Sequence, residues 1–145
     1  MLELHVEALT ENLERVLNFV ETRLEELDCP MKIQAQIDIA VEEIYVNIAH
    51  YAYQSGTGQV TICIETEENS GIVVIRFIDS GIPFNPLERE DPDVTLSAEE
   101  RNIGGLGIFM VKKSMDDVSY EYKDGHNILT IKKKINQVHH PSAHA

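Results

Sequence analysis

Two hydrophobic periods limit the fold of this chain more than any other feature of its sequence. Residues 2–7 alternate apolar and polar side chains, which predicts a half-buried strand. Apolar residues then recur at three- and four-residue spacing through residues 10–27 and 31–51. This spacing predicts two amphipathic helices, with Thr10 as the N-cap of the first and Pro30 between them.

In the second half of the chain, apolar and polar residues again alternate as they do in strands. Residues 59–67 and 72–79 predict one antiparallel hairpin, and residues 117–122 and 127–133 predict another. The second pair is joined at Asp124-Gly125, a dipeptide typical of tight hairpin turns.

Between the hairpins lies a long segment with no period, residues 80–103, followed by a short helix predicted from Gly105 to Met115. The resulting order favours a two-layer α/β sandwich, in which a mixed, mostly antiparallel sheet carries helices on one face. A length of 145 residues fits a single domain, predicted over residues 1–135, with a flexible tail over residues 136–145.

The net charge of the chain excludes some classes of binding partner. Against 12 lysines and arginines stand 25 acidic residues, a net charge of -13, which argues against binding to nucleic acid or anionic lipid. No apolar stretch is long enough to cross a membrane, and the N-terminus does not resemble a signal peptide. Cys29 and Cys63 have no metal-ligand spacing, so we expect reduced thiols in a cytoplasmic protein.

Glu43 and Asn47 form the first candidate site. A spacing of four places both side chains on one side of the second helix, beside its apolar stripe. The carboxylate is a candidate proton acceptor, and the amide oxygen is a candidate ligand for Mg²⁺. The alternative is a pair of boundary residues that only solvate the helix.

Asp79 and Gly81 form the second candidate site. Period two places Asp79 on the apolar face of its strand, at the strand's end, where its carboxylate can accept a hydrogen bond from an exocyclic amine. Gly81 allows another group to approach the backbone closely. The alternative is an ordinary Asp-Ser-Gly turn.

The third candidate site is a run of glycines at the start of the last helix, Gly104, Gly105 and Gly107. Unpaired N–H groups at a helix N-terminus can bind an anion without a basic side chain. The spacing is neither a Walker A motif nor a dinucleotide-binding fingerprint. A flexible hinge is the alternative.

Together, the three sites resemble the motifs of the Bergerat-fold ATPases, the GHKL superfamily, over nearly the whole chain. Within that superfamily, the segment from Ala40 to Tyr53 and the run Gly104-Gly105-Leu106-Gly107 are similar to those of the anti-sigma-factor serine kinases of bacterial partner-switching systems.

The resemblance implies roles for individual residues. Asp79 and Gly81 would receive adenine, Asn47 would bind Mg²⁺ between the phosphates of ATP, and Glu43 would be the general base. Gly104, Gly105 and Gly107 would present N–H groups to the phosphates. Arg101 is the candidate contact for the γ-phosphate, with Lys112 as the alternative, and residues 80–103 would form a lid over the ATP.

The implied function is that of a serine kinase that binds a sigma factor and phosphorylates an anti-anti-sigma partner of the STAS type. The resemblance also allows a homodimer. A different class remains open, a nucleotide-gated regulatory module that binds a protein partner without phosphotransfer. A structural α/β domain with coincidental glycines is the third alternative. The first helix has no histidine, which argues against a self-contained histidine kinase.

The acidity of the chain is concentrated in the predicted lid. Six carboxylates lie there with Arg89 as the one basic residue among them: Glu88, Glu90, Asp91, Asp93, Glu99 and Glu100. Phosphates bound beneath such a lid would repel it, so we expect the segment to be mobile or partly disordered without ligand.

Overall fold

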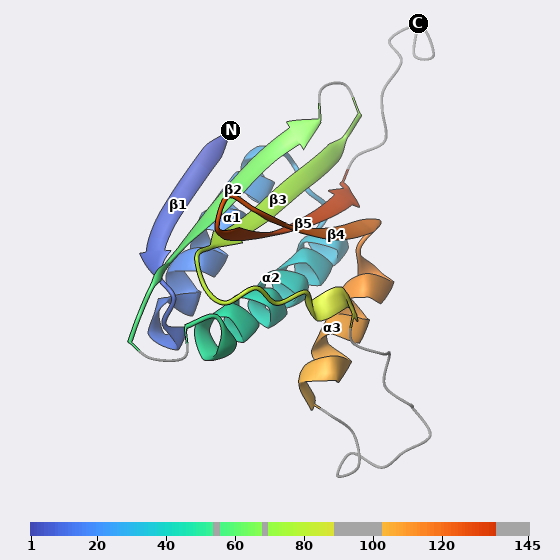
Figure 1. The fold of residues 1–145 in the computed structure, drawn as a ribbon. Helices are drawn as coiled ribbons and strands as arrows, with labels where there is room; N and C mark the ends of the chain where they lie inside the picture. The colour runs from blue at the N-terminus through green and yellow to red at the C-terminus, as the bar shows by residue number, and fades with distance from the viewer. Residues whose placement is uncertain (54–55, 68–69, 89–102, 136–145) are drawn as a thin grey trace, which may run out of the picture.

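The architecture is one five-stranded sheet with helices on one face, seen in a computed structural model that describes residues 1–53, 56–67, 70–88 and 103–135 (Figure 1). The strand order is β1-β2-β3-β5-β4. The strands are β1 (Leu2–Glu7), β2 (Gln59–Glu67), β3 (Ile72–Asp79), β4 (Asp117–Lys123) and β5 (His126–Lys134). All four pairings are antiparallel, so the described sheet has no parallel pair and is simpler than the mixed sheet that the sequence predicts.

Three α-helices cover the sheet: α1 (Leu13–Glu26), α2 (Met31–Tyr51) and α3 (Ile103–Ser114). The bounds of α2 agree with the prediction, but Thr10 is not the N-cap of α1. A 3-10 turn (Thr10–Asn12) precedes the helix, and Thr10 lies inside it. Asn12 instead ties this turn to the end of β1, donating from Nδ2 to the Glu7 carbonyl oxygen at 2.9 Å. None of the described helices is long and apolar enough to span a membrane.

The core fills the space between the sheet and the helices. It combines the apolar stripes of α1 and α2 with the alternating inward residues of β2, β3 and β5, as their spacing predicts. Its largest fully buried side chains include Leu24, Ile37, Tyr45, Ile62 and Phe77. Because α2 crosses this core, one edge of the helix faces the end of β3, where Asp79 lies.

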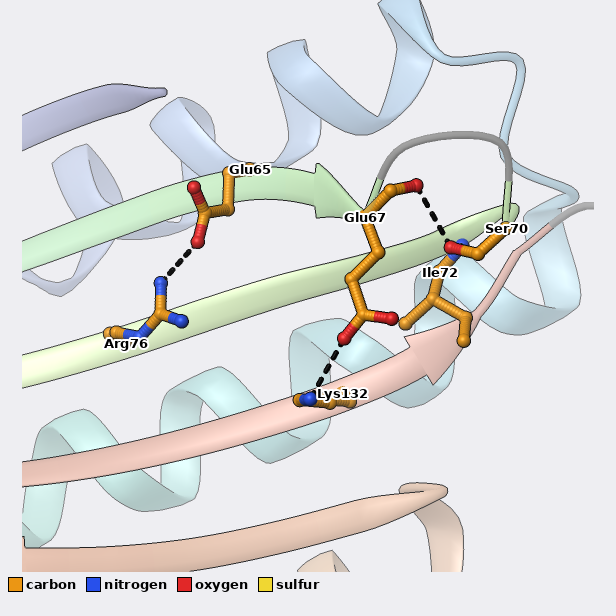
Figure 2. Close-up of polar contacts among 6 residues, drawn as sticks. All are labelled: Glu65, Glu67, Ser70, Ile72, Arg76 and Lys132. Atoms are coloured by element: carbon orange, nitrogen blue, oxygen red, sulfur yellow. Dashed lines mark hydrogen bonds and ion pairs between the residues drawn. The ribbon is translucent and has the colours of Figure 1, made fainter.

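The other face of the sheet carries no helix among the described residues, and charged side chains pair across its strands (Figure 2). Arg76 pairs with Glu65 across β3 and β2, and Lys132 pairs with Glu67 at 2.8 Å. Cys63 lies on the same face, only 3% exposed, and burial raises the pKa of its thiol to about 11. Both cysteines are free thiols, as expected from their spacing.

The predicted lid is described only at its start. Residues 80–88 follow Asp79 at the end of β3. They end in a 3-10 turn (Pro86–Glu88) that the sequence pattern does not predict. The expected mobility of the lid concerns residues 89–102, which lie outside the described residues, as do Arg101 and the predicted tail. The domain boundary at residue 135 stays a prediction.

A pair of carboxyl groups lies between α1 and α2. Oδ1 of Asp38 is buried and has no hydrogen-bond donor among the described residues. Burial, together with a hydrogen bond to the carboxyl group of Glu21 and the charge of that group, raises the pKa of Asp38 from 3.8 to about 7. Asp38 therefore keeps its proton up to about neutral pH and can donate it in the hydrogen bond to Glu21.

This pair makes the stability of the fold depend on pH. Between about pH 4 and pH 7 the folded chain binds a proton that the unfolded chain releases, so the pair's contribution is complete below pH 4 and is lost by pH 7. In Asp38→Asn the amide donates to Glu21 without taking up a proton. We expect this variant to gain stability over the wild type at pH 8 by about 1 kcal/mol, a value reduced for solvent screening.

The measurement is the melting temperature of both proteins at pH 5 and pH 8. The difference between variant and wild type should grow by about 3 °C from the lower to the higher pH. Glu25→Gln, an exposed change on α1, is the control and should leave that difference flat. Equal pH dependence in Asp38→Asn and the wild type would refute the raised pKa of Asp38.

Candidate functional site

A pocket opens between α2, α3 and the inward face of the sheet. Its empty volume is about 640 Å³, including the space at its open mouth. Apolar side chains from α2, α3, the sheet and the segment after β3 form most of its lining: Ile44, Ile48, Phe77, Ile82, Phe84, Pro86, Ile108 and Leu129. Polar residues line it at Asn47, Tyr51, Asp79, Tyr120 and Asn127, a combination that suits a flat, largely apolar ligand with a few polar edges.

Asp79 is a buried carboxylate at the bottom of this site. It is 5% exposed, on the inward face of β3, as period two predicts. Its Oδ1 accepts from the backbone N–H of Gly81 at 2.8 Å and from Nδ2 of Asn127 at 2.9 Å. No partner of Oδ2 occurs among the described residues. Asp79 therefore has one oxygen engaged by the protein and one available to a ligand in the pocket.

Hydrogen bonds hold the segment after Asp79 against the end of α2. Ile82 donates its backbone N–H to the carbonyl oxygen of Ala52 at 3.0 Å, and Ser80 donates its own to the Tyr53 hydroxyl at 2.9 Å. A Cβ at Gly81 would lie 2.2 Å from the Ala52 carbonyl oxygen. Glycine is therefore required here for the approach of the segment to α2, a constraint separate from the room for a base that the resemblance implies.

Glu43 and Asn47 lie one turn apart on α2, as their spacing predicts, but only Asn47 lines the pocket. Both side chains are partly buried. Glu43 lies against α3, because a Cβ at Gly107 would be 2.1 Å from its Oε2. Glycine at position 107 thus allows the two helices to approach until the carboxylate of Glu43 meets the α3 backbone.

The other glycines of the third motif begin α3. Gly104 and Gly105 lie in the first turn of the helix, which starts at Ile103 rather than at Gly105. Lys112 lies in the last turn, about 10 Å along the helix axis from Gly105, so a γ-phosphate contact at the glycine end does not follow from its place in the helix. The other candidate, Arg101, is outside the described residues.

A divalent cation fits this site only if a ligand supplies most of its oxygens. The described residues contain no group of three or more His, Cys, Asp or Glu side chains that could hold a metal. Asn47 offers one partly buried amide at the pocket. One protein oxygen completed by phosphates and water is the coordination that Mg²⁺ accepts, so the residues present fit a metal carried by a phosphorylated ligand.

The three sequence motifs do not include three polar residues that the structure places at the site. Asn127 and Tyr120 line the pocket, and Tyr53 holds the backbone after Asp79. The place of Asn127 could have been predicted from the alternation of β5, because Asn127 lies on the same inward face of the strand as Leu129 and Ile131. A polar residue in an apolar phase indicates a buried partner, which here is Asp79 in the same row of the sheet.

Comparison with protein families gives one match over most of the chain. The family described as "Histidine kinase-like ATPase domain" matches residues 6–133, which include all three candidate motifs.

Among curated proteins, the chain is similar to serine-protein kinases named RsbW. Those of Bacillus thuringiensis (strain Al Hakam) and Bacillus cereus (strain 03BB102) are 30% identical over 98 residues, covering 65% of this chain and 60% of each relative. That of Bacillus mycoides (strain KBAB4) is 28% identical over the same length. The chain thus spans about three fifths of the length of the relatives it matches.

Solved structures show the same fold at low sequence identity. The RsbU and RsbW domains of a Mycobacterium tuberculosis protein match with a TM-score of 0.64 at 16% identity, over 93% of this chain and 33% of that one. The histidine kinase AdeS of Acinetobacter baumannii matches with a TM-score of 0.54 at 14% identity, over 94% of this chain and 70% of that one.

Proposed function

Because the chain belongs to the family of histidine kinase-like ATPase domains, we propose that it binds Mg²⁺-ATP in this pocket and phosphorylates a partner protein on serine. The observation that carries the proposal is that Asp79 and Asn47 line one apolar pocket, with Glu43 one turn before Asn47 on α2. An adenine ring suits the apolar walls, and its exocyclic amine suits an acceptor at Asp79.

The chain's own residues have separate tasks in this mechanism. Oδ2 of Asp79 accepts a hydrogen bond from the adenine amine, and the amide oxygen of Asn47 holds the metal. The N–H groups at the start of α3, in the turn of Gly104 and Gly105, face the phosphates, where the helix dipole favours negative charge. Mg²⁺, when bound, neutralises charge on the phosphates.

Glu43 acts on the substrate hydroxyl. The serine oxygen forms its bond to the γ-phosphorus as the bond to the bridging oxygen of ADP breaks, and the carboxylate of Glu43 takes up the hydroxyl proton. Since Glu43 lies against Gly107 and does not line the pocket, the side chain must turn towards the phosphates when substrate arrives.

The position of Glu43 also favours a second candidate, a nucleotide-gated module that binds a protein without phosphotransfer. In such a module the partner would bind the nucleotide-bound chain with a different affinity from the nucleotide-free chain. The two candidates share the pocket and differ only in whether Glu43 reaches a serine hydroxyl.

The proposed partners rest on the resemblance of the three motifs to those of the anti-sigma-factor serine kinases. That resemblance supports a sigma factor as the held partner and an anti-anti-sigma protein of the STAS type as the substrate. The similarity to serine-protein kinases named RsbW supports phosphorylation on serine. A homodimer and a cytoplasmic location belong to the same proposal.

The test of the proposal begins with thermal unfolding. Mg²⁺-ATP at about 100 times its Kd should raise the melting temperature by about 5–10 °C, because it binds only the folded chain. ATP with EDTA should give a smaller rise, since the metal is then absent. Incubation with a STAS-type protein should then yield phosphoserine. A nucleotide-induced rise without phosphoserine would favour the second candidate, and no rise would refute both.

A further inference from the structure

Asn127 has every hydrogen-bonding position of its side chain satisfied by the protein. Nδ2 donates to Oδ1 of Asp79 and to the carbonyl oxygen of Ile82, each at 2.9 Å, with a longer contact of 3.5 Å to the carbonyl oxygen of Gly81. Oδ1 accepts from the Tyr120 hydroxyl and from the backbone N–H of Phe84, the latter at 3.2 Å. These donated and accepted bonds fix which end of the amide faces Asp79. At 6% exposed, the group has little access to water.

The consequence falls on Asp79. With Gly81 and Asn127 both donating to Oδ1, the carboxylate cannot rotate without breaking a buried hydrogen bond. Oδ2 is then the single acceptor that the carboxylate offers to a ligand. The same amide anchors the segment after β3 at Ile82 and Phe84, two residues that line the pocket. One side chain thus sets both the direction of the acceptor and the position of the wall beside it.

We propose that Asn127 is a positioning residue that makes the pocket selective for bases with an exocyclic amine opposite Asp79, such as adenine, over guanine. The proposal rests on the proposed nucleotide binding and deepens it. Guanine presents a carbonyl oxygen where adenine has the amine, and two acceptors repel each other there. A carboxylate free to rotate would instead accept from the N–H groups on guanine's neighbouring edge, so discrimination depends on holding Asp79 still.

Asn127→Leu tests the proposal by removing the amide at similar volume. The readout is the ratio of the Kd values of Mg²⁺-GTP and Mg²⁺-ATP, measured by calorimetry on the full chain. We expect the ratio to fall by about tenfold or more, because the variant removes one of the two buried hydrogen bonds that hold the carboxylate. Asn85→Ala is the matched control, since Asn85 lies in the same segment and its Oδ1 accepts only the local Leu87 N–H. It should leave the ratio unchanged.

A second variant, Asn127→Asp, keeps the shape and removes the donor. It places a second carboxylate beside Asp79. Among the described residues, the titratable groups beside it are Asp79 of β3 and Tyr120 and Tyr122 of β4. At pH 8 the variant should bind Mg²⁺-ATP at least tenfold more weakly than the wild type. At pH 5.5 a proton shared by the two carboxyl groups restores the donor, and affinity should recover relative to the wild type. A purely structural loss would not recover with pH.

The outcomes separate the two proposals. A wild-type chain that binds no Mg²⁺-ATP overturns the proposed function and this inference with it. A wild-type chain that prefers ATP, together with an unchanged ratio in Asn127→Leu and no recovery of Asn127→Asp at low pH, overturns this inference alone. Melting curves of both variants establish that they are folded, and Asn127→Asp supplies the answer if Asn127→Leu does not fold.

Discussion

Glu43→Gln should lose phosphotransfer to the partner's serine by at least about 100-fold while it binds Mg²⁺-ATP within about twofold of the wild type. The amide has the shape of the carboxylate, so it can occupy the same place against Gly107 without disturbing the contact between α2 and α3. It cannot take up the hydroxyl proton. Affinity is spared because Glu43 does not line the pocket in which the base would bind.

The experiment measures phosphoserine formation under single-turnover conditions and nucleotide affinity separately. Glu42→Gln is the matched control, since Glu42 is the neighbouring carboxylate on the same helix and is exposed to solvent. It should transfer phosphate at the wild-type rate. If Glu43→Gln retained the wild-type rate, Glu43 would not be the general base.

Asp79→Asn should lower the affinity for Mg²⁺-ATP by at least about 100-fold without unfolding the chain. Its amide oxygen still accepts from Gly81 and Asn127, so the buried hydrogen bonds of Oδ1 survive. The amide nitrogen must then stand where Oδ2 stood, and its donor faces the donor of the adenine amine. The loss combines a missing charge-assisted hydrogen bond with a repulsion between two donors.

Calorimetry of Mg²⁺-ATP binding measures the loss, and a melting curve without nucleotide checks the fold. Asp124→Asn is the control, because this exposed turn residue has φ 53°, a conformation that Asn tolerates as well as Asp. It should bind nucleotide like the wild type. Unchanged affinity for Mg²⁺-ATP in Asp79→Asn would show that Asp79 does not bind the adenine ring.

Much of the fold could be predicted from hydrophobic period alone. The strands and α2 appear where alternation and helical spacing place them, because each element buries one face on a single core. The start of α1 could not be predicted in this way. Thr10 has the chemistry of an N-cap, but the contact of Asn12 with the end of β1 selects a 3-10 turn, and that contact joins different elements.

The candidate site could be predicted only where a single element carries it. Asp79 and the Glu43–Asn47 pair follow from position on a strand and on a helix. Asn127 could not be assigned to Asp79 without the strand order, which brings β5 beside β3 although 46 residues separate β3 from His126. The contact of Glu43 with Gly107 likewise depends on how closely α2 and α3 pack, which local spacing does not encode.

The contact between Gly107 and Glu43 changes how variants of the glycine motif should be interpreted. Any side chain at position 107 would first displace the carboxylate of Glu43, whatever the residue's relation to phosphate. Loss of transfer in a Gly107 variant would therefore reflect displacement of Glu43, the proposed general base, and its signature would be a lower kcat with nucleotide affinity retained. Gly105, two residues nearer the start of α3, is the better position at which to test the proposed phosphate contacts.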